Sequence, residues 1–538
     1  MKIKKIAADR ENIRFEFAAD AETAAENRSQ TDCPAELTVE ELLPTVGGKS
    51  KIISTHRVRP ENGTLTLPRF TENETHDRMF SKFRIYSGRE QLKGDKYVSE
   101  IDPEAAENNA PFPKFRSIKA MNAAPEIQAR MKVEQGRPDV SLPGIMTTLP
   151  DDNTIPFERE GRTYYFRRDA IAQFDEYMRA YEYCTLILLN SSRSFGSRHE
   201  KPLLDMCLHP AYDAENPNAL ISAFNLRTEE GLGCYAAFLE FLFRRYTRAD
   251  GRYGRVIGAV IGNEVDQQGI WGNAGDMTCE DYIGEYSAAM RLAWQIGRKY
   301  YSAFRVYISL TNNWSVATPG SNLRFYTAKK CVTELAVRSR TEGDFEWGVA
   351  YHPYPENLFY PDFWNDRTAS FSFDTPHITF KNMEVLEAFL AQELFLYKGE
   401  PRRIIFSEQG FNTVKGQLEG HFERNGEAGI VLAYMKARNM KTVDMFTHHS
   451  SVDNPGEFGL NLGLIKYDPE APGHIGQPKP AFFAFMAMDT EDEPEFVERA
   501  RQRIDPDLFD FLLHPVVNTP VRTAEDELNE SILTNTNG

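Results

Sequence analysis

The chain has 538 residues, of which 41% are hydrophobic and 26% are charged, and its formal net charge is −17. This length predicts a large α/β domain with smaller appended units, because one small hydrophobic core needs far fewer residues. A surface this acidic repels nucleic acid and anionic membranes, so neither is expected as a partner. No apolar run approaches the roughly 18 residues that a membrane-spanning helix requires.

The N-terminus and the cysteines indicate a reducing compartment. Residues 1–6 are followed by polar residues rather than by the apolar core of a secretory signal. The six cysteines form no C-x-x-C pair, so free thiols are expected instead of a disulfide framework or a zinc site. The sequence therefore predicts a cytoplasmic protein without a metal or cofactor.

The first 110 residues are predicted to form a small β-sandwich-like domain. Short segments at 13–17, 51–55, 64–67 and 82–86 alternate apolar and polar residues between Gly, Pro and Asn turns. No cluster of catalytic residue types falls in this region. Residues 108–113 are predicted to link this domain to the rest of the chain.

From about residue 140 the pattern becomes a repeat of strand, loop and helix. Eight strand candidates begin at Val140, Cys184, Leu220, Val256, Phe304, Phe345, Arg403 and Val443. Apolar residues recur at helical spacing between them, as at Ile171, Phe174, Met178 and Tyr181 and at Ile283, Tyr286, Met290 and Trp294.

This alternation predicts a closed (β/α)₈ TIM barrel over residues 111–490, because parallel strands need crossovers and cover on both faces. A doubly wound open sheet is the alternative, but no G-x-G-x-x-G or Walker-type loop follows an early strand. Residues 491–538 are predicted to form an acidic helical segment and a tail.

Polar side chains follow the predicted strands at their C-terminal ends, where TIM-barrel enzymes place their active sites. The fourth strand ends in Asn263 and Glu264, and the seventh ends in Ser407 and Glu408. Both carboxylates are therefore expected in one funnel. The other strand ends supply Asn190, Asn225, Arg227, Thr311, Asn312, Asn313, Trp314, Tyr351, His352, Tyr354, Thr447, His448, His449 and Ser450.

A (β/α)₈ barrel with Asn-Glu closing its fourth strand and Glu closing its seventh resembles clan A of the glycoside hydrolases, which includes the family 5 cellulases and mannanases. The segment from His352 to Tyr354 is similar to the His-x-Tyr of family 5. More closely, residues 161–166, 186–190 and 379–383 resemble an uncharacterised bacterial group of glycosidase-like barrels that carry an N-terminal β domain. The resemblance covers about residues 80–490.

The resemblance implies that Glu264 is the acid/base and Glu408 the nucleophile of a retaining mechanism. Such enzymes hold two carboxyls about 5–5.5 Å apart. Asn263 would then bind the sugar 2-hydroxyl, His352 another sugar hydroxyl, and Tyr354 or Tyr351 would orient Glu408. Tryptophans in the loops after strands four, five and six are candidate stacking platforms, namely Trp271, Trp314 and Trp364.

Several of these residues also have other interpretations. Arg227 either binds a substrate carboxylate or pairs with Glu229 or Glu230. His448 and His449 are candidate substrate contacts, or metal ligands together with Asp453, although no H-x-x-x-H spacing supports a metal. Neighbouring strand residues point in opposite directions, so only one of the two histidines should face the funnel.

Two positions differ from the clan's pattern. Val265 follows the Asn-Glu pair where proline is usual, and strand eight offers His448 and His449 where a tryptophan is common. The sequence predicts a retaining O-glycoside hydrolase that acts on a β-linked glycoside or oligosaccharide. A non-catalytic carbohydrate-binding barrel and a metal-dependent hydrolase are the alternatives, and homo-oligomer formation is left open.

Overall fold

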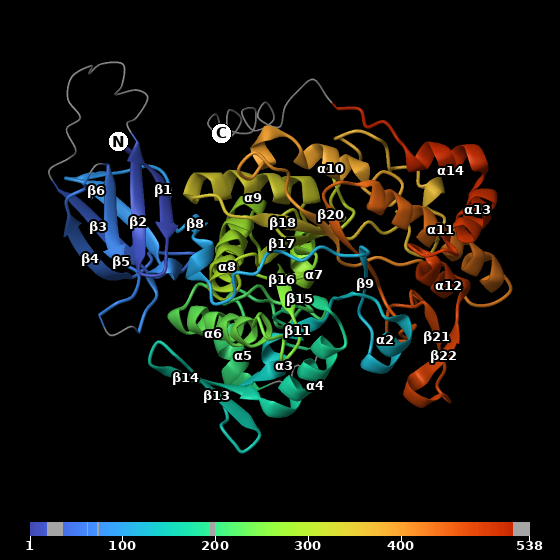
Figure 1. The fold of residues 1–538 in the computed structure, drawn as a ribbon, viewed down its shortest axis with the longest axis horizontal. Coiled ribbons are helices and arrows are strands. Elements are labelled where there is room, and N and C mark those ends of the chain that lie inside the picture. Colours follow the sequence, from blue (N-terminus) through green and yellow to red (C-terminus); the bar gives the residue numbers. More distant parts are fainter. Residues whose placement is uncertain (19–35, 62, 73–74, 194–199, 520–538) are drawn as a thin grey trace.

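A computed structural model describes residues 1–18, 36–61, 63–72, 75–193 and 200–519 of the chain. Cys33 and most of the predicted C-terminal tail lie outside these residues. Figure 1 shows a strand-rich unit at one side, a barrel in the centre and a group of helices at the other side.

The N-terminal unit is a sandwich of two four-stranded sheets, as predicted. One sheet has the order β5-β2-β1-β8 and the other β4-β3-β6-β7. The rings of Phe15 and Phe83, one from each sheet, meet edge to face at 5.0 Å, which places the core between the sheets. The strands are β1 (Lys2–Ala8), β2 (Asn12–Ala18), β3 (Leu37–Leu42), β4 (Ile52–Val58), β5 (Thr64–Pro68), β6 (Lys82–Ser87), β7 (Glu90–Gln91) and β8 (Glu100–Ile101).

The central sheet closes into a parallel barrel. Its order is β10-β9-β20-β19-β18-β17-β16-β15-β11, and β10 also pairs with β15. Because β10 and β11 both pair with β15, they fill one position, and the barrel has eight. The strands are β9 (Lys119–Met121), β10 (Gln135–Gly136), β11 (Asp139–Ser141), β15 (Tyr183–Leu189), β16 (Val256–Ile261), β17 (Arg305–Leu310), β18 (Trp347–Tyr351), β19 (Ile404–Phe406) and β20 (Val443–His448).

Two of the predicted strand positions need correction. The segment from Leu220 to Leu226 is not a strand; it lies in the loop after β15 and makes only isolated bridges. Its apolar character has another cause, because Ile221 packs against the barrel interior. The first barrel strand is instead β9, which has three residues and is too short to show alternation. The two errors cancel, so β16 is the fourth strand and β19 the seventh.

Helices cover the outside of the barrel. The two amphipathic patterns in the sequence correspond to α4 (Arg168–Arg179) and α8 (Cys279–Tyr300). The other crossover and loop helices are α2 (Pro125–Met131), α3 (Leu142–Ile145), α5 (Lys201–Cys207), α6 (Glu229–Tyr246), α7 (Gln268–Trp271), α9 (Ala328–Glu342), α10 (Glu384–Leu390) and α11 (Glu419–Asn439).

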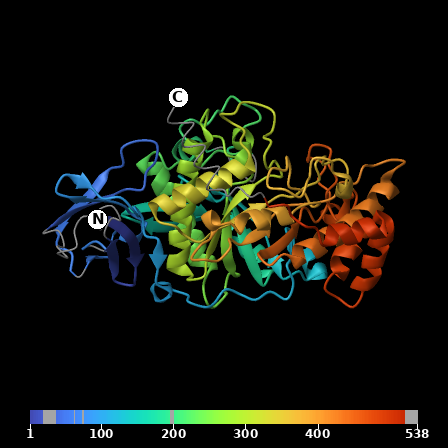
Figure 2. The same cartoon turned by 90° about the horizontal axis from the view of Figure 1, so that it is seen from above.

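Three helices follow the barrel and pack against α11 or each other: α12 (Pro480–Ala487), α13 (Glu493–Ile504) and α14 (Pro506–Leu513). Viewed from above, they extend the molecule on the side opposite the sandwich (Figure 2). None of the helices that the structure describes is long and apolar enough to cross a membrane.

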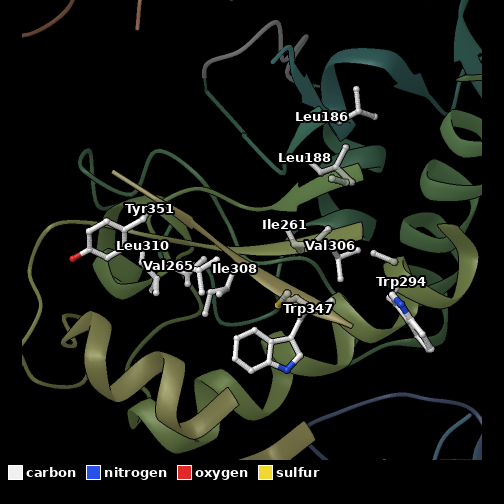
Figure 3. Close-up of a cluster of buried hydrophobic side chains, with 14 of the residues drawn as sticks. Leu186, Leu188, Ile261, Val265, Trp294, Val306, Ile308, Leu310, Trp347 and Tyr351 are labelled. Atoms are coloured by element: carbon white, nitrogen blue, oxygen red, sulfur yellow. The ribbon is translucent and has the colours of Figure 1, made fainter. Parts of the chain in front are cut away.

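Two hydrophobic layers hold the barrel. Its interior contains side chains from seven strand positions, among them Val260, Tyr307 and Ile405, which form one buried cluster. The outer layer lies between strands and helices, where Ile261, Ile308 and Leu310 point toward the same side as Trp347 (Figure 3). Strands that are buried on both faces appear as continuous apolar runs, which is why the barrel strands are visible in the sequence.

Two smaller antiparallel units decorate the barrel. A hairpin after the second strand position consists of β13 (Thr154–Arg159) and β14 (Arg162–Arg167), with β12 (Met146–Thr147) added to β14. It lies beside α6 (Figure 1). A second pair, β21 (Ile465–Tyr467) and β22 (Ile475–Pro478), follows β20.

Candidate active site at the carboxyl ends of the strands

Glu264 stands at the end of β16 in an unusual backbone conformation. Its φ and ψ angles are 40° and 56°, in the left-handed region that residues with a Cβ seldom adopt. The backbone N–H of Glu264 donates to Ser309 Oγ of β17 at 2.9 Å, and its carbonyl accepts from Gln267 N at 2.8 Å. Glu264 is one of eight non-glycine residues with a positive φ in the described part of the chain, and these two hydrogen bonds hold its backbone in that conformation.

His352 connects the ends of the fourth and seventh strands. Its side chain is fully buried just after β18. Nδ1 lies 2.8 Å from Glu264 Oε1, and Nε2 lies 3.1 Å from the hydroxyl of Ser407, which precedes Glu408. The imidazole therefore fixes the position of the Glu264 carboxylate relative to the strand that carries Glu408.

Glu408 is held as an anion by its surroundings. The Tyr354 hydroxyl donates to Oε1 at 3.1 Å, and Arg137 Nη2 lies 3.8 Å from Oε2. Burial by itself raises the pKa of Glu408, but the charges of His449, His352 and Arg137, with the Tyr354 hydrogen bond, lower this pKa to about 2. Glu408 is therefore ionised at neutral pH.

Arg137 is a site residue that the sequence pattern does not reveal. It is fully buried between β10 and β11, and its Nη1 donates to Asp139 Oδ1 at 2.5 Å. The predicted strand begins at Val140, so the polar residues before it fall in a predicted loop. A strand beginning at Gln135 would have placed this arginine among the strand residues that face inward.

The two carboxylates converge. One oxygen of Glu264, one oxygen of Glu408 and one ring nitrogen of His352 all lie within 4.8 Å of one another. The side chains of Glu264 and Glu408 are 17% and 20% exposed, so both carboxylates remain open to solvent. We call Glu264, His352, Glu408, Tyr354 and Arg137 the carboxylate site.

Among the described residues, Glu264, His352 and Glu408 form the one group whose spacing could offer three ligands to a metal ion. Carboxylate oxygens and an imidazole nitrogen suit zinc. Both ring nitrogens of His352 are, however, engaged with Glu264 and Ser407. A metal would have to displace one of these hydrogen bonds.

The two histidines of strand eight point to different surroundings. His448 is buried, its Nε2 lies 2.9 Å from the Leu462 carbonyl oxygen, and burial lowers the pKa of its imidazole to about 3. It packs between the rings of Phe411 and Phe485. This position in the core corrects the expectation that His448 contacts substrate.

His449 adjoins the carboxylate site. Its Nε2 lies 2.6 Å from Glu457 Oε1 and its Nδ1 lies 3.5 Å from Arg137 Nη2. Burial lowers the pKa of His449, but Glu408 and Glu457 outweigh this effect and raise it. Glu457 comes from the long loop after β20, where no periodic pattern marks it. The third member of the expected metal set, Asp453, is instead paired with Lys479 at 2.7 Å.

The candidate stacking tryptophans differ in position. Trp314 is fully buried, its indole N–H donates to the Phe373 carbonyl, and it packs edge to face on Phe389, so it belongs to the core. Trp364 is also buried and packs on Phe363. Trp271 is partly exposed and rests on the cluster inside the barrel. Of the three, Trp271 alone is not buried, and its contact with a ligand stays a prediction.

The two tyrosines near the end of strand six, Tyr351 and Tyr354, lie in different surroundings. Tyr351 is fully buried and belongs to the hydrophobic layer outside the barrel, where it lies near Leu310 (Figure 3). Tyr354 is the residue that contacts Glu408. Alternation along the strand decides this, because Tyr351 and His352 must point to opposite faces.

Two further candidates serve the fold. Arg227 pairs with Glu285, at 2.7 Å from Nη2 to Oε1. The sequence offered Glu229 or Glu230 as its partner in one of two alternatives. The Asn190 amide donates to the carbonyls of Cys207 and Ala223, and so it ties the loop after β15 together. Asn190 is fully buried by its contacts, and the binding of substrate by Arg227, whose side chain is 32% exposed, stays a prediction.

Asn313 and Asn263, two asparagines that were expected to contact substrate, lie after the ends of their strands. The Asn313 amide donates to the Thr318 hydroxyl at 2.9 Å within the loop after β17. Asn263 is partly buried beside Glu264, where the clan resemblance placed a sugar contact. The contact of either residue with substrate stays a prediction.

The fold and this site define a class of protein: a closed (β/α)₈ barrel in which two carboxylates meet at the ends of the fourth and seventh strands. The sequence pattern of a family described as "Family of unknown function (DUF5722)" matches residues 111–508. The chain belongs to this family. None of the curated proteins compared with the chain is similar to it.

Three of the solved structures with a similar arrangement are glycosidases. One is a family 39 glycoside hydrolase from Bacteroides cellulosilyticus WH2, at 12% identity, with 90% of this chain and 81% of that chain covered and a TM-score of 0.41. A second is a β-glucosidase from Pyrococcus furiosus, at 14% identity, 72% and 85% coverage and a TM-score of 0.40.

A third similar structure is the family 39 enzyme from Xanthomonas axonopodis pv. citri, at 14% identity, 70% and 67% coverage and a TM-score of 0.41. Since these TM-scores are below 0.5, the barrel assignment rests on the chain's own strand pairing. The likeness to family 5 in particular stays a prediction.

Proposed function

We propose that the protein is a retaining O-glycoside hydrolase that acts on a β-linked glycoside or oligosaccharide. The observation that carries the proposal is the approach of Glu264 and Glu408, whose nearest oxygens lie within 4.8 Å. Retaining glycosidases separate their carboxyls by about 5–5.5 Å, and inverting ones by about 6.5–9.5 Å to admit a water. The spacing supports double displacement.

The surroundings of the two carboxylates support different roles for them. Glu408 is ionised, and its pKa of about 2 suits a nucleophile whose charge must be present when substrate arrives. Since Glu408 supplies the charge, the proton for the leaving group has to come from Glu264. His352 holds Glu264 Oε1 at 2.8 Å and so aims the other carboxylate oxygen.

In the first step Glu264 protonates the glycosidic oxygen while the bond from that oxygen to the anomeric carbon breaks and Glu408 attacks the carbon. The products are an alcohol and a glycosyl ester on Glu408. In the second step Glu264, now a carboxylate, takes a proton from water, the resulting hydroxide attacks the anomeric carbon, and the ester bond breaks. Both side chains return to their starting charge.

The test uses a panel of nitrophenyl β-glycosides with the full chain and the variants Glu264→Gln and Glu408→Gln. We expect turnover to fall by on the order of 10³-fold or more in each variant, because one removes the proton donor and the other the nucleophile. A surface carboxylate paired with Lys466 provides the matched control, Glu419→Gln, which should keep full activity.

A 2-fluoro-glycoside with a good leaving group should label Glu408, as read by peptide mass, and the first product formed should keep the anomeric configuration of the substrate. Undiminished turnover in both glutamate variants would refute the proposal. Binding of glycosides without turnover by the unaltered chain would favour a non-catalytic carbohydrate-binding barrel.

A metal-dependent hydrolase is the second candidate, favoured only by the ligand spacing of Glu264, His352 and Glu408. It predicts that a chelator abolishes activity and that Zn²⁺ or another divalent ion restores it. Activity that is insensitive to chelator, together with labelling of Glu408, would exclude this candidate.

A further inference from the structure

A cavity of about 330 Å³ lies where the N-terminal sandwich meets the barrel, among β4, the β13–β14 hairpin and α6. Figure 1 shows the β13–β14 hairpin beside α6. We call it the junction cavity. None of the residues lining it belongs to the carboxylate site. Its volume is at the lower end of the range for small-molecule sites, roughly 300–1,000 Å³, and such sites favour domain boundaries.

One wall of the junction cavity is a network of ion pairs that is already satisfied. His76 lies 2.8 Å from Glu160 Oε1 and 2.8 Å from Ser81 Oγ. Glu160 also pairs with Arg159 at 2.8 Å, and Glu41 accepts hydrogen bonds from the side chains of Ser54, Arg78 and Ser81. This wall is therefore preformed and does not need a ligand to compensate its charges.

The opposite rim offers groups with unused hydrogen-bonding capacity. Within the described residues, neither the Tyr164 hydroxyl nor the Arg162 guanidinium has a hydrogen-bonding partner, and Arg162 is exposed. Lys51 and Glu229 pair at 2.9 Å, but both are partly exposed and keep further donors and acceptors. The rim therefore supplies both donors and acceptors to whatever enters.

Space and apolar surface accompany these polar groups. A Cβ placed at Gly233 of α6 would lie 2.6 Å from the Tyr164 hydroxyl oxygen, so any other residue at this position would displace the hydroxyl. Ile53 and Leu232 add aliphatic surface to the lining. A ring with hydroxyl groups at its edge and C–H groups on its face would match both kinds of surface.

We propose that the junction cavity binds a small neutral saccharide, of one or two sugar units, at a site separate from the carboxylate site. Four cations and three carboxylates line it, namely Lys51, His76, Arg159, Arg162, Glu41, Glu160 and Glu229, and most of them are paired. Walls of nearly balanced charge do not select a charged ligand, whereas hydroxyl groups donate and accept and can use both signs. The inference does not depend on the proposed function.

The experiment is calorimetric titration of the full chain with glucose, mannose, xylose and cellobiose. A parallel titration with inorganic phosphate tests whether the cavity binds an anion instead. We expect one of the sugars to bind. The variant Arg162→Ala/Tyr164→Phe removes two rim donors and should weaken that binding by about tenfold, as the loss of one or two hydrogen bonds predicts. Thermal unfolding should be unchanged, because neither group has a hydrogen-bonding partner in the described part of the fold.

Two controls locate the site. Tyr165→Phe alters the next residue of β14, which does not line the cavity, and should leave affinity unchanged. Glu408→Gln should also leave it unchanged. The inference is overturned if no sugar binds, if the Arg162→Ala/Tyr164→Phe variant binds as well as the parent, if Glu408→Gln alone removes binding, or if phosphate binds in place of sugar. None of these outcomes depends on turnover, so they leave the test of the glycosidase separate.

Discussion

The carboxylate site and the wall of the junction cavity are built from the same parts but differ in how their charges are satisfied. Each places a histidine between a carboxylate and a serine: His352 between Glu264 and Ser407, and His76 between Glu160 and Ser81. Glu160 is 32% exposed, so the difference does not lie in the carboxylate that contacts each histidine. It lies in the second carboxylate of each region, which is Glu41 at the junction and Glu408 at the strand ends.

At the junction Glu41 is 1% exposed and accepts three hydrogen bonds from side chains. At the strand ends Glu264 and Glu408 are 17% and 20% exposed, and among the described residues each accepts one. A carboxylate whose lone pairs are filled by the fold stabilises it, whereas one left open toward solvent is available to a substrate.

The largest effect is expected from the buried arginine that serves both stability and acidity. Arg137→Met leaves Asp139 and Glu408 without their cation, so the free energy of unfolding should fall by about 3 kcal/mol. The pKa of Glu408 should rise, which moves the acid limb of the pH–activity profile upward. Urea denaturation and the profile measure the two effects.

The control for Arg137→Met is Arg324→Met, which breaks more exposed pairs with Asp213 and Asp276 and should change stability by about 0–1 kcal/mol. Equal losses of unfolding free energy in the two variants would show that the burial of Arg137 does not increase its contribution to stability.

The next effect concerns the imidazole that positions Glu264. His352→Phe removes both of its hydrogen bonds, and we expect kcat to fall by about 10²-fold because a misplaced proton donor is a poor one. Ser407→Ala removes only the bond at Nε2 and should have a smaller effect. Steady-state kinetics on an aryl glycoside measure kcat for both variants. A larger loss of kcat in Ser407→Ala than in His352→Phe would contradict this role of His352.

The junction histidine should make stability depend on pH. Burial lowers the pKa of His76, but Glu160 and Glu41 raise it to about 9, compared with an ordinary value of 6.5. The folded chain therefore binds more protons than the unfolded chain between these values. The stabilisation is complete below pH 6.5 and is lost as the pH rises through 9.

Chemical unfolding at pH 6 and at alkaline pH measures this dependence. The difference between the parent and His76→Gln should shrink as the pH rises. His474→Gln, at an exposed position, should show no such trend. A difference that is the same at both pH values would contradict the role assigned to His76.

The smallest effect is expected at Arg227. Because this residue pairs with Glu285 at a partly exposed position, Arg227→Gln should change stability by about 0–1 kcal/mol and leave kcat/KM nearly unchanged. A rise in KM confined to substrates that carry a carboxylate would restore the interpretation of Arg227 as a substrate contact.

Much of the barrel was predictable because its strands are buried on both faces. Segments such as Val256–Ile261 appear as unbroken apolar runs, and the polar residues that come after them mark the strand ends. Strand β9 was missed because three residues carry no pattern, and the Leu220 segment was misassigned because a loop that covers the barrel interior is also apolar. Local sequence cannot tell these cases apart.

The sequence by itself determined the pair at the centre of the site, because the end of a buried strand followed by a carboxylate is a local pattern that occurs at both Glu264 and Glu408. Only the tertiary structure decided which groups surround the pair. Arg137 and Glu457 come from segments without a pattern. Trp314 and Arg227 follow predicted strands, but Trp314 packs in the core and Arg227 pairs with Glu285. The physical reason is that burial and pairing depend on partners far away in the chain, and no local pattern encodes them.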